Sequence, residues 1–260
     1  MELELRKQKE REHANKIKTL LKGAEDKERV ASNKKFYAIT RSSQGYINNW
    51  LLERVGRGKK FLDYCCGTGE FSISLARNGA NVTGIDISDV SIKIAKENAT
   101  KYGLRDKIDF LVMDAEKLEF DDNTFDTIVC GGVLHHLDIE KAYSELARVL
   151  SFNGEIICGE PLAYNPIFQL YRKITPHLRT EWEAGHILNK KSINLSKHYF
   201  NKIELRMFHL TTLLAVPFRH LFFFNSALSF FELVDSILLR MPLIKWLAWQ
   251  VVFILSRPKK

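Results

Sequence analysis

Cysteine is scarce in this chain of 260 residues, which contains only four. None forms a Cys-x-x-Cys pair, and three lie in apolar runs that predict strands; the four are Cys65, Cys66, Cys130 and Cys158. A disulfide scaffold and a structural zinc site therefore fit poorly. We interpret all four as reduced thiols of a cytoplasmic protein and predict no bound metal.

Long hydrophobic runs are also lacking. The longest apolar stretch, residues 220–231, ends at Glu232, whereas a spanning helix needs about 18 apolar residues. The first seven residues, Met-Glu-Leu-Glu-Leu-Arg-Lys, contain no apolar core of a secretory signal. We therefore predict neither a secretory signal nor a spanning helix, while an interfacial helix stays open.

Charges of one sign form no run of five or more residues, although the net charge is +8. An acidic middle, residues 61–160, separates the basic flanks 1–60 and 161–260. Solvation of surface helices explains so diffuse an excess, and binding to nucleic acid or an anionic membrane is the functional alternative. No repeat or low-complexity linker divides the chain, which favours one large α/β domain, with or without a lid.

The first 55 residues predict a helical extension. Residues 1 to about 30 are rich in Glu and Lys and poor in core-type side chains, so we expect an exposed helix that contributes little to a core. Aromatic and aliphatic residues return over 36–55 and predict a helix that packs beside the main domain.

From residue 59 onward, short apolar runs alternate with amphipathic segments of helix length. The runs predict strands at 60–65, 81–85, 108–113, 125–131 and 155–159. The segments predict helices at 70–78, 90–102 and 139–150. This alternation predicts a Rossmann-like core over residues 56–160, with helices on both faces of a parallel sheet. Ligands of such folds bind at the carboxyl ends of the strands.

After residue 161 the pattern changes. Two further strands are predicted at 202–210 and 246–256, which would complete a mostly parallel sheet of seven strands. Between them lies a strongly apolar segment, residues 213–243, that predicts two helices. Residues 161–260 are thus interpreted as a helical lid on the substrate side together with the last two strands.

A Gly-x-Gly turn follows the first predicted strand and contains Gly67 and Gly69. A dinucleotide fingerprint would need a third glycine at position 72, which is Ser. Asp63 precedes the turn, and its carboxylate would repel a pyrophosphate but suit a cationic ligand. A nicotinamide oxidoreductase is therefore the least favoured enzyme class.

Acidic residues also end the next two predicted strands. Asp86 has the spacing of a carboxylate that accepts from ribose hydroxyls, and Asp114 can accept from an adenine amino group. A single acidic strand end can equally be a helix N-cap. Three acidic residues after consecutive strands weaken that structural interpretation.

The segment Asp63–Gly69, together with Asp86, Asp114-Ala115-Glu116 and Phe125-Asp126, resembles the class I S-adenosylmethionine (SAM) dependent methyltransferases. The branch most resembled includes the ubiquinone and menaquinone biosynthesis methyltransferases, over about residues 55 to 160. The resemblance implies SAM as cofactor, with S-adenosylhomocysteine as product. The cofactor residues it implies are Asp63, Cys65, Gly67, Gly69, Asp86, Ile87, Asp114, Ala115 and Gly131. One of these departs from the family, which usually has Gly where this chain has Cys65; we expect Cys65 either to narrow that wall or to point into the core.

The resemblance also implies where methyl transfer occurs. His135 and His136 follow the fourth predicted strand, and Glu160 ends the fifth. Histidine suits a general base for a hydroxyl or an acidic carbon. The structural alternatives are a helix cap for a histidine and an ion pair with a lid arginine for Glu160. We predict these three as catalytic candidates and favour oxygen as the methyl acceptor because bases are available.

Polar, aromatic and basic residues after the fifth strand are expected to cover the pocket. The substrate-binding candidates are Tyr37, Tyr164, Arg172, Arg179 and His186. The apolar segment 213–243 has three interpretations: a lid that lines a pocket for a hydrophobic acceptor, an interfacial helix at a membrane, or ordinary packing onto the sheet. The first two favour a hydrophobic acceptor.

These observations predict a SAM-dependent methyltransferase of a hydrophobic or amphipathic small molecule, cytoplasmic or peripheral at a membrane. An RNA or protein acceptor is an alternative suggested by the basic flanks. It lacks the interleaved aromatic and basic residues of nucleic-acid-binding sheets, so a nucleic-acid partner is disfavoured. A non-catalytic SAM-binding module is the third hypothesis. The sequence makes no prediction of oligomeric state.

Overall fold

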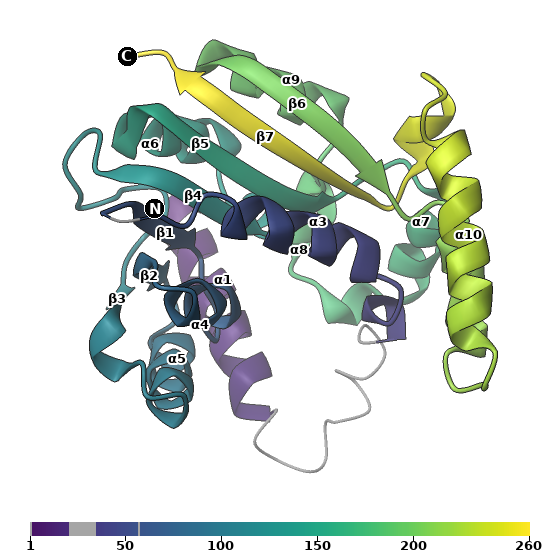
Figure 1. Ribbon diagram of the computed structural model, residues 1–260, viewed down its shortest axis with the longest axis horizontal. Coiled ribbons are helices and arrows are strands. Elements are labelled where there is room, and N and C mark those ends of the chain that lie inside the picture. Colours follow the sequence, from purple (N-terminus) through teal and green to yellow (C-terminus); the bar gives the residue numbers. More distant parts are fainter. Residues whose placement is uncertain (1, 21–34, 57) are drawn as a thin grey trace.

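The computed structural model describes residues 2–20, 35–56 and 58–260 of the chain. Its centre is a seven-stranded sheet with the order β3-β2-β1-β4-β5-β7-β6 (Figure 1). The strands are β1 (Lys60–Tyr64), β2 (Asn81–Asp86), β3 (Ile108–Val112), β4 (Phe125–Gly131), β5 (Leu150–Pro161), β6 (Phe200–Phe208) and β7 (Gln250–Pro258). Strands β1 to β5 pair in parallel, and β7 is antiparallel to both β5 and β6. The predicted mostly parallel sheet is confirmed.

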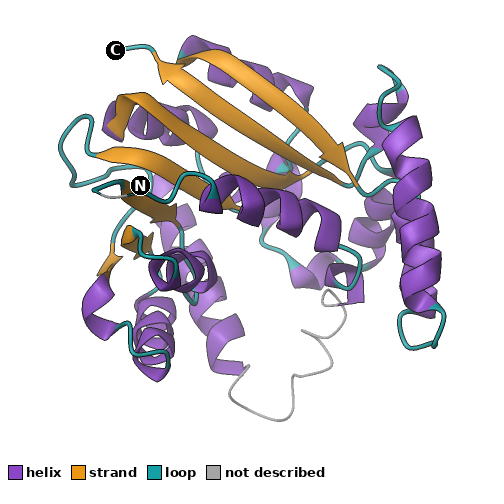
Figure 2. Cartoon of the chain, viewed as in Figure 1, coloured by secondary structure: helices purple, strands orange, loops and turns teal. Residues whose placement is uncertain are grey.

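Helices cover both faces of this sheet (Figure 2). The α-helices are α1 (Glu2–Leu20), α3 (Arg41–Leu52), α4 (Glu70–Arg77), α5 (Asp89–Lys101), α6 (Ile139–Val149), α7 (Pro166–Ile174), α8 (Glu181–His186), α9 (Lys190–Leu195) and α10 (Phe224–Leu238). Short 3-10 helices are η1 (Arg105–Lys107), η2 (Leu134–His136), η3 (Pro176–Leu178), η4 (Ser196–His198), η5 (Thr212–Phe218) and η6 (Ile244–Leu247).

Alternate strand residues supply the two core layers. Leu62 and Tyr64 of β1 pack in the layer of α6 and α9, whereas Phe61 packs in the layer of α3, α4 and α5. Successive side chains of a strand point to opposite faces, so uninterrupted apolar runs are what a sheet covered on both sides requires. This is why the apolar runs located the parallel strands to within a few residues.

The predicted bounds deviate by five residues at the start of β5 and by up to four residues in the last two strands. Strand β6 ends at Phe208 rather than at residue 210 because His209 has φ 66°, outside the strand conformation. Helix η6 occupies most of the predicted start of the last strand, which begins at Gln250. The predicted helix pair in 213–243 corresponds to η5 and α10. The division at residues 55 and 160 stays a prediction.

The prediction for the N-terminal helix was wrong in one respect. Helix α1 forms as expected, but Arg6 on it is 8% exposed and is held by polar partners. The low hydrophobicity of α1 gave no indication of this contact. The helix is anchored by ion pairs, and it has no apolar stripe that a sequence pattern would reveal. Residues 21–30 of the predicted helix lie outside the described residues.

Candidate active site

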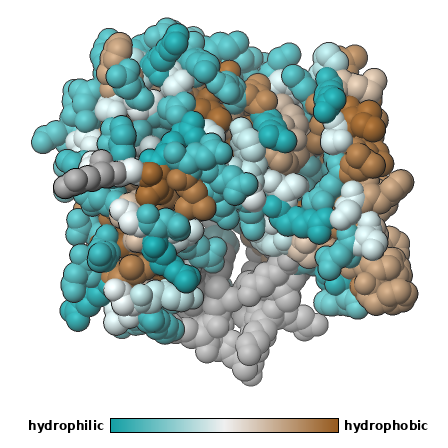
Figure 3. Space-filling model, viewed as in Figure 1, coloured by the Kyte–Doolittle hydropathy of each residue, from teal (hydrophilic) through white to brown (hydrophobic). Residues whose placement is uncertain are grey.

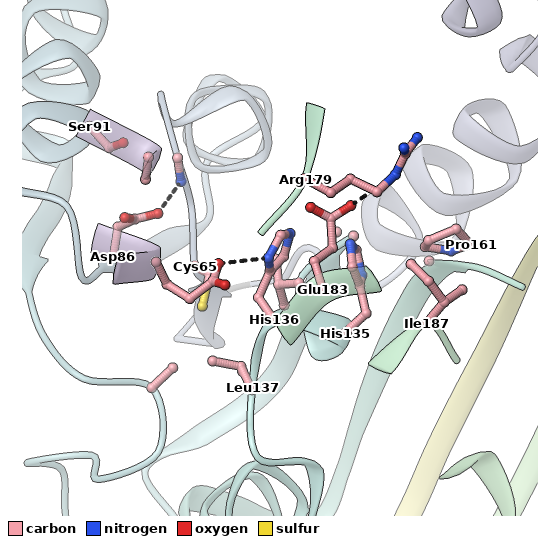
Figure 4. A pocket seen from close by; sticks show the side chains of 18 of the residues that line it. Cys65, Asp86, Ser91, His135, His136, Leu137, Pro161, Arg179, Glu183 and Ile187 are labelled. Carbon is pink, nitrogen blue, oxygen red and sulfur yellow. Dashed lines mark hydrogen bonds and ion pairs between the residues drawn. The ribbon is translucent and has the colours of Figure 1, made fainter. Parts of the chain in front are cut away.

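A cavity of about 810 Å³ opens at the carboxyl ends of the parallel strands, with walls from α1, α4, α7 and α8 (Figure 4). Twelve of the predicted site residues line it: Tyr37, Cys65, Gly67, Asp86, Ile87, Asp114, Ala115, Gly131, His135, His136, Arg172 and Arg179. Five do not: Asp63, Gly69, Glu160, Tyr164 and His186. Most of the predicted residues thus lie together at the strand ends, where ligand sites of such folds are expected.

The turn after β1 is built by three residues with positive φ. Cys65, Gly67 and Gly69 have φ 59°, 54° and 80°. At Gly69 a Cβ would lie 2.9 Å from the ring of Phe110, so this position requires glycine for space as well as for conformation. Gly67 lines the cavity and donates its N–H to Asp86 Oδ2 at 2.9 Å.

Asp63 lies beneath this turn and does not face the cavity, contrary to our interpretation of it as a cofactor contact. It shares the strand face of Phe61, which points toward α4. There its Oδ2 accepts from the Ser72 N–H at 3.0 Å and from the Ser72 hydroxyl at 2.6 Å, in the first turn of α4. Burial raises the pKa of the Asp63 carboxyl to about 6, against the lowering effect of Ser72. Asp63 thus fixes the turn from below.

The other two acidic residues predicted at strand ends, Asp86 and Asp114, do line the cavity. Asp86 Oδ1 accepts from the Ser88 N–H at 2.8 Å, so Asp86 links the glycine turn to the start of α5. Asp114 Oδ1 accepts from the Glu116 N–H at 2.9 Å. Both carboxylates sit at neighbouring strand ends, which fits acceptors for the hydroxyl and amino groups of an adenosine.

Cys65 combines the two outcomes that we considered for it. It lines the cavity, and it also packs against the core layer of α6. Burial, with Asp86 and Asp63 nearby, raises the pKa of its thiol well above the usual value. The thiol is therefore neutral at physiological pH and supplies bulk at this wall.

Helix α1 covers the part of the cavity where the predicted adenosine-binding residues lie. Arg6 forms an ion pair with buried Glu116, and Lys7 Nζ lies 2.5 Å from Asp114 Oδ2. Glu10 accepts from the Thr180 hydroxyl and lies 3.0 Å from His136 Nδ1. The Nε and Nη1 groups of Arg6 are buried without a hydrogen-bond partner among the described residues. These donors fit a ligand in the cavity, because a buried unpaired donor is costly.

Glu160 lies under the cavity floor and orients His135. Its Oε1 accepts from the N–H groups of Val133 and Leu134 at 2.7 and 2.8 Å. Its Oε2 lies 2.7 Å from Nδ1 of His135, a residue that lines the cavity. Both oxygens of Glu160 thus have partners, and the hydrogen bond to Nδ1 orients the His135 ring with its Nε2 directed away from Glu160. Glu160 does not line the cavity, and no lid arginine pairs with it in the described part of the chain; its predicted catalytic role stays a prediction.

His136 has a different environment from His135, although their ring centroids are 4.2 Å apart. Burial lowers its pKa, but the hydrogen bond to Glu10 and the charge of Glu183 outweigh this and raise the pKa above the usual value. A protonated His136 paired with Glu10 fastens α1 to η2. Of the two histidines, His135 is therefore the better candidate base.

The predicted substrate residues divide into two groups. Tyr37, Arg172 and Arg179 line the cavity. The Tyr164 hydroxyl accepts from the Lys190 N–H at 3.0 Å outside it. The exposed ring of His186 stacks on Trp182, with centroids 3.7 Å apart, also outside it. These two residues were misassigned because both lie in loops or short helices whose direction the sequence does not indicate.

Sequence reasoning missed the contributions of Arg6, Lys7 and Glu10 from α1, and of Glu183 from α8. It also missed Phe71, whose ring packs on Gly131 so closely that a Cβ there would lie 2.7 Å from Cε2. The alternation of acidic and basic residues in the first turns of α1 was the available signal. No local pattern connected it to strand ends about a hundred positions away.

The comparisons with known proteins agree with this geometry. The sequence profile of a family described as "Methyltransferase domain" matches residues 62–158. The chain carries a class I SAM-dependent methyltransferase domain. SAM is the cofactor of this domain, and the cavity carboxylates, the glycine turn and the unpaired Arg6 donors are groups that fit it.

Two curated relatives match part of the chain. A demethylmenaquinone methyltransferase of Staphylococcus aureus is 36% identical over 110 residues, which cover 41% of this chain and 44% of that protein. A ubiquinone/menaquinone biosynthesis C-methyltransferase, UbiE, of Brucella canis is 35% identical over 115 residues, which cover 43% of each chain. The chain thus matches less than half the length of either relative.

Among solved structures, a geranyl diphosphate C-methyltransferase of Streptomyces coelicolor is similar with a TM-score of 0.58. The similarity covers 84% of this chain and 79% of that one at 16% sequence identity. At this identity the likeness shows the fold, and it extends well beyond the profile match into both flanks.

Proposed function

We propose that the chain transfers a methyl group from SAM to a carbon atom of a hydrophobic or amphipathic small molecule. The observation that supports methyl transfer in this cavity is His135, which faces the cavity with its Nδ1 2.7 Å from Glu160 Oε2. The choice of carbon as acceptor rests on the names of two similar proteins. Nε2 of His135 is then the free basic atom of the ring. A carbon nucleophile must lose a proton as it is methylated, and this atom is placed to accept it.

SAM supplies an electrophilic methyl group on a sulfonium when it is bound. Asp86, Asp114 and the glycine turn would hold the adenosine, and α1 would exclude water above it. Alignment of methyl and acceptor in a dry site is the main contribution of such an enzyme. His135 Nε2 takes the proton that the acceptor carbon releases.

Carbon is proposed here in place of the oxygen acceptor that we favoured from the sequence. The available base does not discriminate between a hydroxyl and an acidic carbon, so that preference had no structural support. The Brucella relative and the Streptomyces structure are both named C-methyltransferases. These names support carbon, and the acceptor itself is to be identified by experiment.

The test is incubation with SAM that carries a deuterated methyl group and an organic extract of the source organism, followed by mass spectrometry. We expect a labelled lipid-soluble product whose label survives ether and ester cleavage. His135→Asn protein is the matched control and should leave the extract unlabelled. Label that is released as methanol, or label found in RNA or protein, would contradict the proposal.

We further propose that the chain docks on an anionic membrane through an apolar face, defined here as the exposed large side chains of η5, α10 and the loop between them. This face comprises Leu214, Phe218, Leu221, Phe222, Phe223, Phe230, Leu233 and Ile237. Phe222 and Leu233 are 98% and 63% exposed. Figure 3 shows the brown surface that lies over α10 at the right of the molecule. Contiguous apolar surface of this kind marks an interaction site.

Charge complementarity selects an anionic bilayer as the occupant. Arg219, Arg240 and Lys245 flank the apolar face. Both acidic residues of segment 213–243 have polar partners. Glu232 forms an ion pair with Arg41 at 2.6 Å, and buried Asp235 accepts from the N–H groups of Leu210 and Thr211. None of the described helices is long and apolar enough to cross a membrane. Apolar side chains with a basic rim are the features of interfacial binding.

Vesicle flotation tests this surface. Vesicles with phosphatidylglycerol should carry the protein, and pure phosphatidylcholine vesicles should carry much less of it. Phe222→Ser with Phe223→Ser should abolish flotation, whereas Phe152→Ser should not; Phe152 is 69% exposed at the start of β5. Equal flotation of the double variant and the wild type, or no flotation at all, would refute the proposal.

A further inference from the structure

Two arginines line the acceptor end of the cavity, away from the adenosine carboxylates. Arg172 lies in the last turn of α7, and Arg179 lies between η3 and α8. Figure 4 shows Arg179 and Glu183 together above His135, with Pro161 and Ile187 beside them. Arg179 therefore lies on the side of the cavity where the proposed base lies, and Arg172 lines the same cavity.

Arg172 has no carboxylate within ion-pair distance among the described residues. Its Nη1 and Nη2 atoms donate to the carbonyl oxygen of Leu162 at 3.3 Å, near the limit for a hydrogen bond. The negative charge of Glu183 favours the charged form of Arg172. The Glu183 carboxylate, however, forms an ion pair with Arg179, at 3.6 Å from Nε. Burial and the neighbouring Arg179 lower the pKa of Arg172 to about 10. Buried charges in proteins are normally paired, so this guanidinium is short of an anion.

A third cation strengthens the positive field at this end. Lys35 Nζ lies 5.0 Å from the ring centroid of Tyr171, and the Arg179 guanidinium carbon lies 5.6 Å from the same ring. Tyr171 neighbours Arg172 in the sequence and packs in the same helix. Lys35 and Arg179 thus both contact the ring of Tyr171, next to Arg172, and Glu183 is the carboxylate that acts on Arg172.

An apolar wall continues from the arginines. Phe36, Phe168 and Trp249 line the same cavity. The rings of Phe168 and Trp249 are stacked at 4.6 Å with an angle of 5°, and Arg172 lies 5.8 Å from the Phe168 centroid. A charged recess next to stacked aromatic rings matches a molecule that has an anionic group beside a hydrocarbon part.

We infer that Arg172 and Arg179 bind an oxyanion of the methyl acceptor, a carboxylate or a phosphate, while the aromatic wall holds its hydrocarbon part. Both oxyanions suit the planar fork of a guanidinium. This inference rests on the proposed function and narrows its substrate class to anionic amphiphiles. The arginines also set the direction of the acceptor, because an anchored head fixes which carbon reaches His135.

The test measures binding without turnover, in protein saturated with S-adenosylhomocysteine. Calorimetric titrations compare decanoate, decyl phosphate and decanol, which share one chain and differ in the head group. We expect the better of the two anions to bind about tenfold or more tightly than decanol, as for a charge-assisted hydrogen bond. The order of decanoate and decyl phosphate identifies the oxyanion.

Variants test which residues cause the preference for an anionic head group. Arg172→Met should reduce anion binding to the level of decanol, and Arg172→Lys should restore part of it. Arg105→Met is the matched control, because Arg105 is exposed in η1 outside the cavity. Phe222→Ser should keep the preference, which separates the cavity from the apolar face. S-adenosylhomocysteine affinity reports that each variant is folded.

Equal affinity of wild-type protein for decanol and both anions would overturn the inference, even if a variant failed to fold. So would equal losses in the Arg172→Met and Arg105→Met proteins. Neither result bears on carbon methylation, which the labelling experiment tests separately. Conversely, an oxygen-methylated product would contradict the proposed function and leave the oxyanion site in place.

Discussion

The two ends of the cavity are built on opposite principles. At the cofactor end, carboxylates at strand ends, Asp86 and Asp114, face a rigid glycine turn. At the acceptor end, cations and aromatic rings come from α7, α8 and the segments around them. The first end is built from strand ends and a glycine turn, and the second from helices and the segments between them. The sheet therefore determines the donor, and the flanking segments determine the acceptor.

The largest expected effect is at the junction of the two ends. His135→Asn should lower kcat by about 10²- to 10⁴-fold through loss of a general base, with S-adenosylhomocysteine affinity unchanged. The measurement is single-turnover methyl transfer together with calorimetry. If cofactor affinity fell as much as the rate, His135 would contribute to cofactor binding, and the two ends of the cavity would not act separately.

Next in size is a loss confined to the cofactor end. Asp86→Ala should weaken S-adenosylhomocysteine binding by about 2 kcal/mol, because ribose hydroxyls lose a charged acceptor. Calorimetry measures it, and Asp109→Ala, an exposed change on β3, is the matched control. Binding of decanoate should survive in both variants. Unchanged cofactor affinity in Asp86→Ala protein would show that the carboxylate serves only the Gly67 and Ser88 amides.

Two buried groups outside the cavity should respond to acid with opposite signs. Burial lowers the pKa of His209, near α10, to about 4, and burial raises that of Asp63 to about 6. Native His209 resists protonation, so its contribution to stability is present above pH 6.5 and is lost as pH falls toward 4. Native Asp63 binds its proton more tightly than the unfolded chain does, so its contribution is present below pH 3.8 and is lost as pH rises through 6.

Between pH 7 and pH 5 these effects amount to a loss of about 2 kcal/mol from His209 and a gain of about 1 kcal/mol from Asp63. Denaturant unfolding at several pH values measures both. His209→Gln should become relatively more stable at pH 5, and Asp63→Asn relatively less stable. Parallel slopes in the two variants and the wild type would show that neither group is titrated as its environment implies.

The smallest effect concerns the departure from the family at the turn. Cys65 has φ 59°, where a side chain costs about 1 kcal/mol. Cys65→Gly should therefore raise the free energy of unfolding by up to about 1 kcal/mol, offset in part by the greater entropy of the unfolded chain. Cys65→Ala keeps the Cβ and should show no gain. A destabilised Cys65→Gly protein would mean that core packing of the thiol outweighs the backbone strain.

The cofactor end was predictable because its signals are local. A strand, a glycine turn and an acidic strand end are adjacent in the sequence, and parallel strands bring such ends to one edge. Asp63 shows the limit of this reasoning. Its residue type suited a ligand, but strand alternation turned its side chain toward Ser72 and away from the cavity.

For the acceptor end, the sequence predicted which types of residue occur there, but not which of them line the cavity. Tyr164 and Arg172 lie in one polar stretch, yet the first contacts Lys190 outside the cavity and the second lines the cavity. Similarly, Glu160 and His135 were both foreseen as catalytic, but only the geometry assigned one to orient the other. Side-chain roles in this region depend on helix directions that loops set.

The sequence by itself determined the sheet, its helices and the cofactor, because apolar periodicity and short-range motifs encode them directly. The tertiary structure decided which residues face the cavity, how α1 closes it through Arg6, Lys7 and Glu10, and that Arg172 lacks a carboxylate partner among the described residues. These features depend on contacts between segments far apart in the chain. Such contacts are set by packing and charge pairing in three dimensions, and no local pattern records them.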